Sequence, residues 1–278
     1  MPVWLPPEAS GTAVGAQPGF EGAVSCGRYL ERPGARECVV LAHGLGGDPF
    51  SSWGAPGSPG ACAERLARDL PAASFFYLDY DARVQTRLDS GARSLPALAE
   101  DAAAAIAALL ERHARVALVG HCLGGLLLRF ALRHLLTQTR GVPLSSARRA
   151  DAALTLVLLD TPEDWPLPSA PGPGPDRRIA AVMRAIGLDA GALRASARWW
   201  SDKQGPAGAV TDHAVLSTGE SWIAPLGPGA PVPAARRATL DCAHADLTRI
   251  APDRPDPRYR AILDALVRDR AACALADV

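Results

Sequence analysis

The chain has 278 residues, with 29 basic and 29 acidic side chains and a formal net charge of zero. Because no basic patch is interleaved with aromatic residues, we do not expect nucleic acid as a partner. No stretch reaches the roughly 18 uninterrupted apolar residues of a transmembrane segment, and residues 1–19 lack the apolar core of a signal peptide, so we expect a soluble, cytoplasmic protein.

Short apolar runs alternate with longer helical patterns along the chain. In order, we expect an edge strand at 23–30, a strand at 37–42, a helix at 58–70, a strand at 74–78, a helix at 94–113, a strand at 115–119, a tight turn at 120–125 followed by a helix at 126–136, a strand at 152–159, helical material at 177–200, strands at 213–218 and 237–242, and a closing helix at 257–275. This alternation predicts an α/β fold, with a mostly parallel sheet and helices on both faces. No linker divides the chain, so we expect one domain over 1–278, with a small cap or lid excursion around 162–210.

The most informative stretch is the turn between the predicted strand at 115–119 and the helix after it. Gly120-His121-Cys122-Leu123-Gly124 matches the nucleophile elbow, G-x-S-x-G, with Cys122 at the nucleophile position. Glycine is expected on both sides, because a Cβ there would clash with neighbouring backbone. The turn also places Cys122 at a helix N-terminus, where N–H groups and the helix dipole favour a thiolate. The simpler alternative is a buried cysteine at a glycine-rich turn.

A glycine-rich loop, His43-Gly44-Leu45-Gly46-Gly47-Asp48, follows the strand at 37–42. It lacks the Lys-Ser/Thr ending of a P-loop and the G-x-G-x-x-G pattern of a dinucleotide site, so no cofactor is expected. Beside a nucleophile elbow, such a loop supplies half of an oxyanion hole, and the N–H after the nucleophile supplies the other half. The donors here are then Leu45 and Leu123, with His43 and Gly44 as candidate substrate-binding residues. A plain surface turn is the alternative.

A nucleophile of this kind needs a base, and the base needs an orienting group. His244 follows the last predicted strand, at the carboxyl edge where ligands gather in open α/β sheets. Glu220 ends the strand before it and gives the order nucleophile, acid, histidine that this architecture favours. Asp160 ends the strand after the elbow and could reach the same imidazole from the other side. We prefer Glu220 on topology and keep Asp160 as the alternative.

Two further groups of residues complete the expectations. Trp199 and Trp200, in the predicted cap, are candidate substrate-binding residues that would line an acyl pocket, unless they pack the cap onto the sheet. The six cysteines are widely spread, with no C-x-x-C pair and no ligand-like histidine spacing, so neither a metal site nor a disulfide framework is predicted. Free thiols are typical of a reducing compartment.

These motifs together resemble a known family. Residues 41–53, LAHGLGGDPFSSW, and 119–126, VGHCLGGL, are similar to the HGLGG-D-P-x-x-x-W and V-G-H-S-L-G-G motifs of lipase-like serine esterases of the α/β-hydrolase superfamily. Residues 159–163 resemble its L-G-T-P-H segment, and residues 244–247 its terminal H-x-D-L. The similarity extends from about residue 38 to residue 249, and it implies the α/β-hydrolase fold.

The chain departs from the family's pattern at two positions. Cys122 replaces the serine, and Asp160 replaces the glycine before T-P. Cysteine in this elbow is similar to that of polyhydroxyalkanoate synthases and dienelactone hydrolases. We therefore expect an enzyme that hydrolyses small-molecule esters or thioesters through an acyl-enzyme on Cys122. The alternatives are an acyltransferase or polymerising synthase, a non-catalytic binding protein of the same fold, and an engineered Ser-to-Cys variant of a serine esterase.

Overall fold

The structure is a computed structural model that describes residues 23–55, 57–58, 61–83, 93–137, 153–162, 188, 190–203, 210–219, 232–250 and 255–274. Within these residues, a seven-stranded sheet has the order β1-β3-β2-β4-β5-β6-β7. Its strands are β1 (Val24–Leu30), β2 (Glu37–Ala42), β3 (Ala73–Tyr80), β4 (Arg115–His121), β5 (Ala153–Leu159), β6 (Val210–Gly219) and β7 (Arg237–Ala243). β1 is antiparallel to β3, and the other neighbouring strands are parallel.

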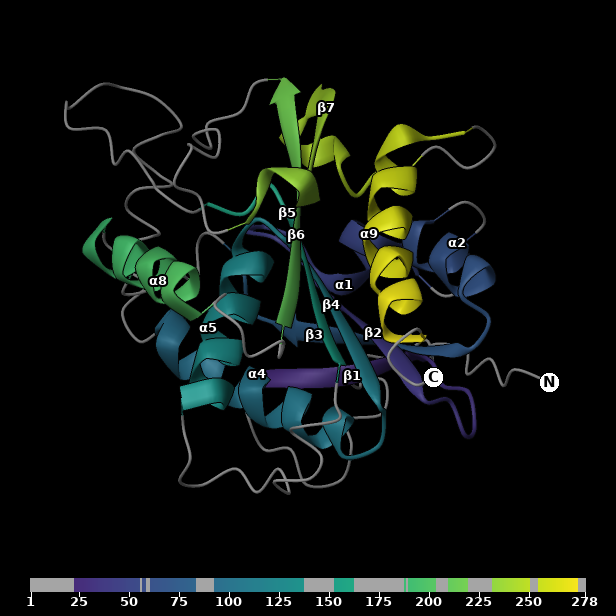
Figure 1. Cartoon of the computed structure of the whole chain (residues 1–278), viewed down its shortest axis with the longest axis horizontal. Coiled ribbons are helices and arrows are strands. Elements are labelled where there is room, and N and C mark those ends of the chain that lie inside the picture. Colours follow the sequence, from purple (N-terminus) through teal and green to yellow (C-terminus); the bar gives the residue numbers. More distant parts are fainter. Residues whose placement is uncertain are drawn as a thin grey trace.

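Helices cover both faces of this sheet. The helices in the described residues are α1 (Pro49–Trp53), α2 (Cys62–Asp69), α4 (Leu95–Leu110), α5 (Leu123–Thr137), α8 (Ala190–Lys203) and α9 (Pro257–Ala274), with short 3-10 turns η1 (Ala234–Arg236) and η2 (His244–Asp246). Figure 1 shows α4, α5 and α8 on one side of the sheet and α2 and α9 on the other. The α/β class, the mostly parallel sheet and the helices on both faces are therefore confirmed.

The central strands are apolar throughout because successive residues point into two different cores. In β2, Val40 belongs to a cluster that also contains Leu127 of α5, whereas the next residue, Leu41, belongs to a cluster with Leu66 of α2 and Ile262 of α9. A strand buried on both faces needs apolar residues at successive positions, because the side chains that point to either face are all buried. This is why the central strands appear in the sequence as continuous apolar runs rather than as alternating patterns.

Some boundaries differ from the sequence-based expectation. β3 continues to Tyr80, β4 continues to His121, and β6 begins at Val210, because strand pairing extends past the apolar runs. The helix expected from residue 58 begins at Cys62. The short helix α1 was not predicted, and Asp48 caps it by accepting hydrogen bonds from the next N–H groups at 2.9 and 3.0 Å.

The topology brings distant segments to one edge. Because β2 and β4 to β7 are parallel, their carboxyl ends lie on the same side of the sheet. The loop at 43–48 follows β2, Cys122 follows β4, Asp160 follows β5 and His244 follows β7. Among the helices that the structure describes, none combines the length and the apolar character needed to cross a membrane.

Candidate active site

Cys122 lies on a sharp turn between β4 and α5. Its φ of 53° is in the left-handed region, which is strained for a residue with a side chain. A Cβ on Gly120 would lie 2.6 Å from the Cα of Gly125, and a Cβ on Gly124 would lie 2.4 Å from the carbonyl oxygen of His43. Both positions therefore need glycine, because any side chain would displace backbone rather than a flexible group. The structure thus contains the strand, strained turn and helix that the elbow motif predicts.

His244 begins the 3-10 turn η2 directly after β7. Its Nδ1 lies 3.1 Å from Oδ2 of Asp160, and only 13% of its side chain is exposed. Burial lowers the pKa of His244, but hydrogen bonds with Asp160 and Cys122 and the charges of both outweigh burial and raise this pKa to about 9. The imidazole is therefore linked on one side to the carboxylate and on the other to the sulfur.

Asp160 is the buried acid of this site. It follows β5 with a φ of 41°, and its amide donates a hydrogen bond of 2.9 Å to the carbonyl of Val215 in β6. Its Oδ1 accepts from the amide of Ser217 at 2.8 Å, and its Oδ2 accepts from the Ser217 hydroxyl and from His244. A carboxylate with 1% exposure needs such partners, because an unpaired buried charge is very costly. Ser217 was not predicted from the sequence, where it is one polar residue near the end of an apolar strand.

His121, the residue before Cys122, lies against the base. Its ring centroid is 4.5 Å from that of His244, with 32° between the planes, and its Nε2 is 3.2 Å from the His244 carbonyl oxygen. Because a carbonyl only accepts, Nε2 carries the proton and donates it. Burial, followed by the nearby His244, lowers the pKa of His121 to about 3, so its ring stays neutral near neutral pH.

The glycine-rich loop after β2 lies beside the cysteine. A Cβ on Gly44 would lie 3.1 Å from the Cβ of Cys122. The Gly46 amide donates to the Ala82 carbonyl at 2.8 Å and holds the loop in place. Among the turn and loop backbone hydrogen bonds of the described residues, none has the amide of Leu45 or Leu123 as its donor. Leu123 is the first residue of α5, where a backbone N–H has no partner within the helix.

His43 does not line an open site with its side chain. The side chain is fully buried, its ring stacks on that of Tyr80 at a centroid distance of 4.4 Å, and its Nδ1 donates to the Gly44 carbonyl at 3.1 Å. The Tyr80 hydroxyl in turn donates to the His43 carbonyl at 2.6 Å. These contacts hold the first residues of the glycine-rich loop in place. Tyr80, the last residue of β3, was not singled out from the sequence.

The two tryptophans of α8 contact α5. The Trp200 ring lies 5.6 Å from the guanidinium of Arg129, and the Trp199 ring lies 5.8 Å from that of Arg133. Trp200 is buried, with 3% exposure, and the two indoles meet edge to face at 5.3 Å. This arrangement favours the packing alternative for these residues, because cation–π pairs on one helix face hold α8 against α5.

Two of the sequence-based predictions lie wholly or largely outside the described residues. Glu220, the preferred acid, is one of them, and the excursion at 162–210 is described only at 162, 188, 190–203 and 210. In the part of the chain that the structure describes, no three His, Cys, Asp or Glu side chains are grouped as metal ligands would be.

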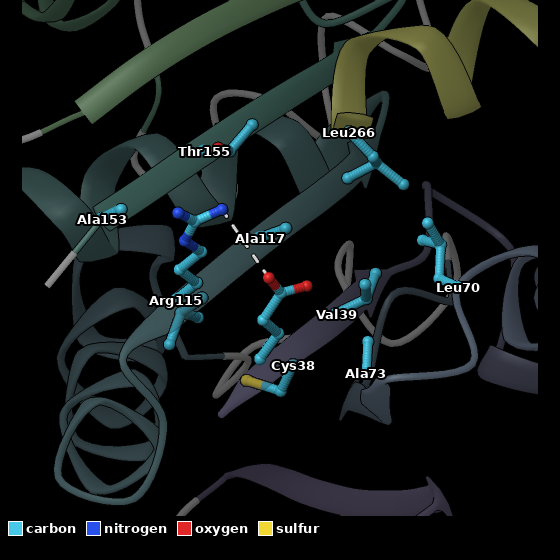
Figure 2. A pocket seen from close by; sticks show the side chains of 11 residues that line it. Cys38, Val39, Leu70, Ala73, Arg115, Ala117, Ala153, Thr155 and Leu266 are labelled. Carbon is cyan, nitrogen blue, oxygen red and sulfur yellow. Dashed lines mark ion pairs between the residues drawn. The ribbon is translucent and has the colours of Figure 1, made fainter. Parts of the chain in front are cut away.

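A pocket is present at the opposite edge of the sheet (Figure 2). It lies at the amino ends of β2, β4 and β5, where Cys38 and Ala153 line it and Arg115 forms an ion pair of 3.6 Å with Glu37. Cys122, His244 and Asp160 are not among the described residues that line this pocket. We therefore assign it no part in the candidate active site.

Comparison with solved structures identifies the fold. MGS-MChE2, an alpha/beta hydrolase enzyme from the metagenome of sediments from the lagoon of Mar Chica, Morocco, matches 90% of this chain over 97% of its own, with a TM-score of 0.54 and 14% identity. A structure from work on LipS and LipT, two metagenome-derived lipolytic enzymes, matches 91% of this chain over 99% of its own, with a TM-score of 0.50 and 15% identity. No protein-family model matches the sequence. No curated protein matches it either.

At these identities the similarity concerns the fold alone. The order of the described strands, the antiparallel pair at the β1 edge and the similarity to these structures show that the chain has the α/β-hydrolase fold.

Proposed function

We propose that the protein is an acyl hydrolase that cleaves carboxylic esters or thioesters through a covalent acyl-enzyme on Cys122. The observation that carries this proposal is the hydrogen-bonded series Cys122, His244 and Asp160 at the carboxyl edge of the sheet. Nucleophile, base and orienting acid within hydrogen-bond reach are what covalent acyl transfer needs. Asp160 takes the role of the orienting acid in this proposal, because it accepts from Nδ1 of His244.

The raised pKa of His244 indicates where the proton resides. With a pKa of about 9, the imidazole holds a proton at neutral pH. A protonated imidazole beside a cysteine is the setting in which cysteine reacts as a thiolate nucleophile. In acylation, the Cys122 sulfur attacks the carbonyl carbon, and the oxyanion accepts hydrogen bonds from the amides of Leu45 and Leu123. Collapse of this intermediate breaks the bond to the leaving group, which takes the proton from His244.

Deacylation uses the same groups in reverse. His244, now neutral, removes a proton from a water molecule, whose oxygen attacks the thioester carbonyl. The second tetrahedral intermediate expels the Cys122 sulfur and releases the carboxylic acid, and the proton remains on His244. Asp160 keeps Nδ1 protonated throughout, so that Nε2 is the nitrogen that exchanges protons.

The test is intact-mass spectrometry after brief exposure to p-nitrophenyl esters and acyl thioesters. We expect the mass of one acyl group on the unmodified chain, none on Cys122→Ala, and much slower acylation of His244→Ala. Cys242→Ala is the matched control, because Cys242 is a free thiol in β7, two residues before His244. Acylation that persists without Cys122, or no acylation by any donor, would show that the proposal is wrong. Release of the free acid into water distinguishes hydrolysis from transfer to an added amine or alcohol.

A further inference from the structure

His244 reaches Cys122 only because the chain turns back across the sheet. Cys122 follows β4, Asp160 follows β5, Ser217 lies in β6 and His244 follows β7, so four adjacent strands each contribute one residue. With neighbouring strands about 4.8 Å apart, β7 lies about 14 Å from β4. The segment that carries His244 must therefore be held over β6 and β5, and Asp160 fixes only one ring nitrogen of that residue.

His121 supplies contacts of a different kind to the same residue. Its Nε2 donates to the His244 backbone carbonyl at 3.2 Å, and its ring lies against one face of the His244 ring at 4.5 Å. The same carbonyl accepts a longer bond of 3.4 Å from the amide of Leu247, the residue that follows η2. His121 thus fixes the backbone and one ring face of His244, while Asp160 fixes the Nδ1 atom of its ring.

His121 also contacts the glycine-rich loop. A Cβ on Gly44 would lie 2.9 Å from Nδ1 of His121, so the imidazole and the Gly44 backbone are packed closely. Since His121 directly precedes Cys122 in the chain, one side chain lies against the base, against the loop that holds Leu45, and beside the nucleophile.

We propose that His121 is a positioning residue that holds His244 and the glycine-rich loop in register with Cys122, through its Nε2–H bond to the His244 carbonyl and its ring contacts. This inference rests on the proposed function, because it assigns His121 a role in the same reaction. The ring must remain neutral for this role, since a cation stacked on the protonated His244 would repel it. The ionisable groups near His121 are the adjacent Cys122 together with His244, Asp160 and His43. Burial, followed by the charge of His244, lowers the pKa of His121 to about 3.

The test compares two amides that differ by one methylene. The nitrogen of His121→Gln reaches about as far as Nε2 and retains a donor for the His244 carbonyl, whereas His121→Asn is too short to reach it. Without the bond, His244 loosens from Asp160 while burial still lowers its pKa. We therefore expect the upper inflection in the pH profile of Cys122 alkylation by iodoacetamide to fall by about one unit in His121→Asn, and acylation at a pH of about 9 to slow roughly fivefold. His121→Gln should remain within about twofold of the unmodified protein.

His113→Gln and His113→Asn form the matched control pair. His113 is also buried and its Nδ1 donates to a backbone carbonyl, that of Ala35 at 2.8 Å, but it precedes the amino end of β4, away from the candidate site. Neither control should change the alkylation profile. Equal profiles for His121→Asn and His121→Gln would overturn the inference, and His121→Phe, which keeps a flat ring without the donor, replaces the Asn variant if that variant does not fold.

The two proposals fail in different ways. If alkylation of Cys122 in the unmodified protein does not depend on His244, as shown by an unchanged profile in His244→Ala, the proposed function fails. If it depends on His244 but is indifferent to the donor at position 121, only the positioning role fails.

Discussion

Replacing Asp160 with asparagine removes one negative charge and leaves the shape of the side chain nearly unchanged. In the folded protein the pKa of His244 stands at about 9, against 6.5 for a free imidazole. The difference of 2.5 units corresponds to about 3 kcal/mol in favour of the imidazolium. Burial opposes it, and the hydrogen bond with Asp160 is the first of the interactions that raise it. Burial stays in the variant while this interaction is lost, so we expect the pKa to fall by about two units or more.

The fall changes the protonation of His244 at working pH. With a pKa of about 9, about 97% of the imidazole is protonated at pH ~7.5, whereas a pKa of about 6.5 leaves about 9%. If acylation requires the protonated base beside the sulfur, Asp160→Asn should acylate about tenfold more slowly at this pH. Asparagine can also turn its NH2 group toward Nδ1 and favour the wrong tautomer, which would slow the reaction further.

Two measurements check this prediction. NMR titration of 15N-labelled histidine gives the pKa of His244 directly, and intact-mass kinetics with a p-nitrophenyl ester gives the acylation rate. Glu220→Gln is the informative control, because Glu220 is the acid that chain topology favours and the change has the same chemistry. An unchanged His244 pKa in Asp160→Asn, or a larger fall in Glu220→Gln, would refute the assignment of Asp160.

Two further predictions concern stability. Because the pKa of His244 is raised on folding, its contribution is fully present below about pH 6.5 and is lost as pH rises through about 9. In urea unfolding, the free energy of unfolding of the unmodified protein should therefore exceed that of His244→Gln by a margin that shrinks by up to about 3 kcal/mol between pH ~6 and pH ~10. A margin that stays constant with pH would contradict the raised pKa. For the tryptophans of α8, Trp200→Ala should lower the free energy of unfolding by about 3 kcal/mol or more, because Trp200 is 3% exposed and contacts Arg129. Trp199→Ala should lower it less, because Trp199 is half-buried. Equal losses in the two variants would contradict this packing.

The sequence allows the local parts of the site to be predicted because their constraints are local. The turn at Cys122 needs glycine on both sides, and the crowding around Gly120 and Gly124 is the physical reason for that pattern. Apolar runs also identify the central strands, because a strand covered by helices on both faces has no solvent-facing side that would carry polar residues. The position of His244 follows from the same logic, since a residue just past a parallel strand lies at the edge where Cys122 lies.

The choice of acid could not be predicted in this way. Asp160 and Glu220 both fall between Cys122 and His244 in the chain, so the order of residues does not distinguish them. What distinguishes Asp160 is its contact with His244, which depends on how the segment after β7 folds back over β6. Ser217 was missed for the same reason, because its two bonds to Asp160 join residues that are 57 positions apart in the sequence.

The position of Asp160 also links the strain in the site to its chemistry. Cys122 and Asp160 are the residues other than glycine that have positive φ in the described part of the chain, and each directly follows a parallel strand. The amide of Cys122 donates to the carbonyl of Leu159, the residue before Asp160, at 2.9 Å, so the two strained turns are joined through backbone. Such conformations persist only where the surroundings hold them. Asp160 is held in its conformation by its hydrogen bonds to β6 and to His244. The same contacts that hold Asp160 at a positive φ therefore also orient the imidazole of His244 toward Cys122.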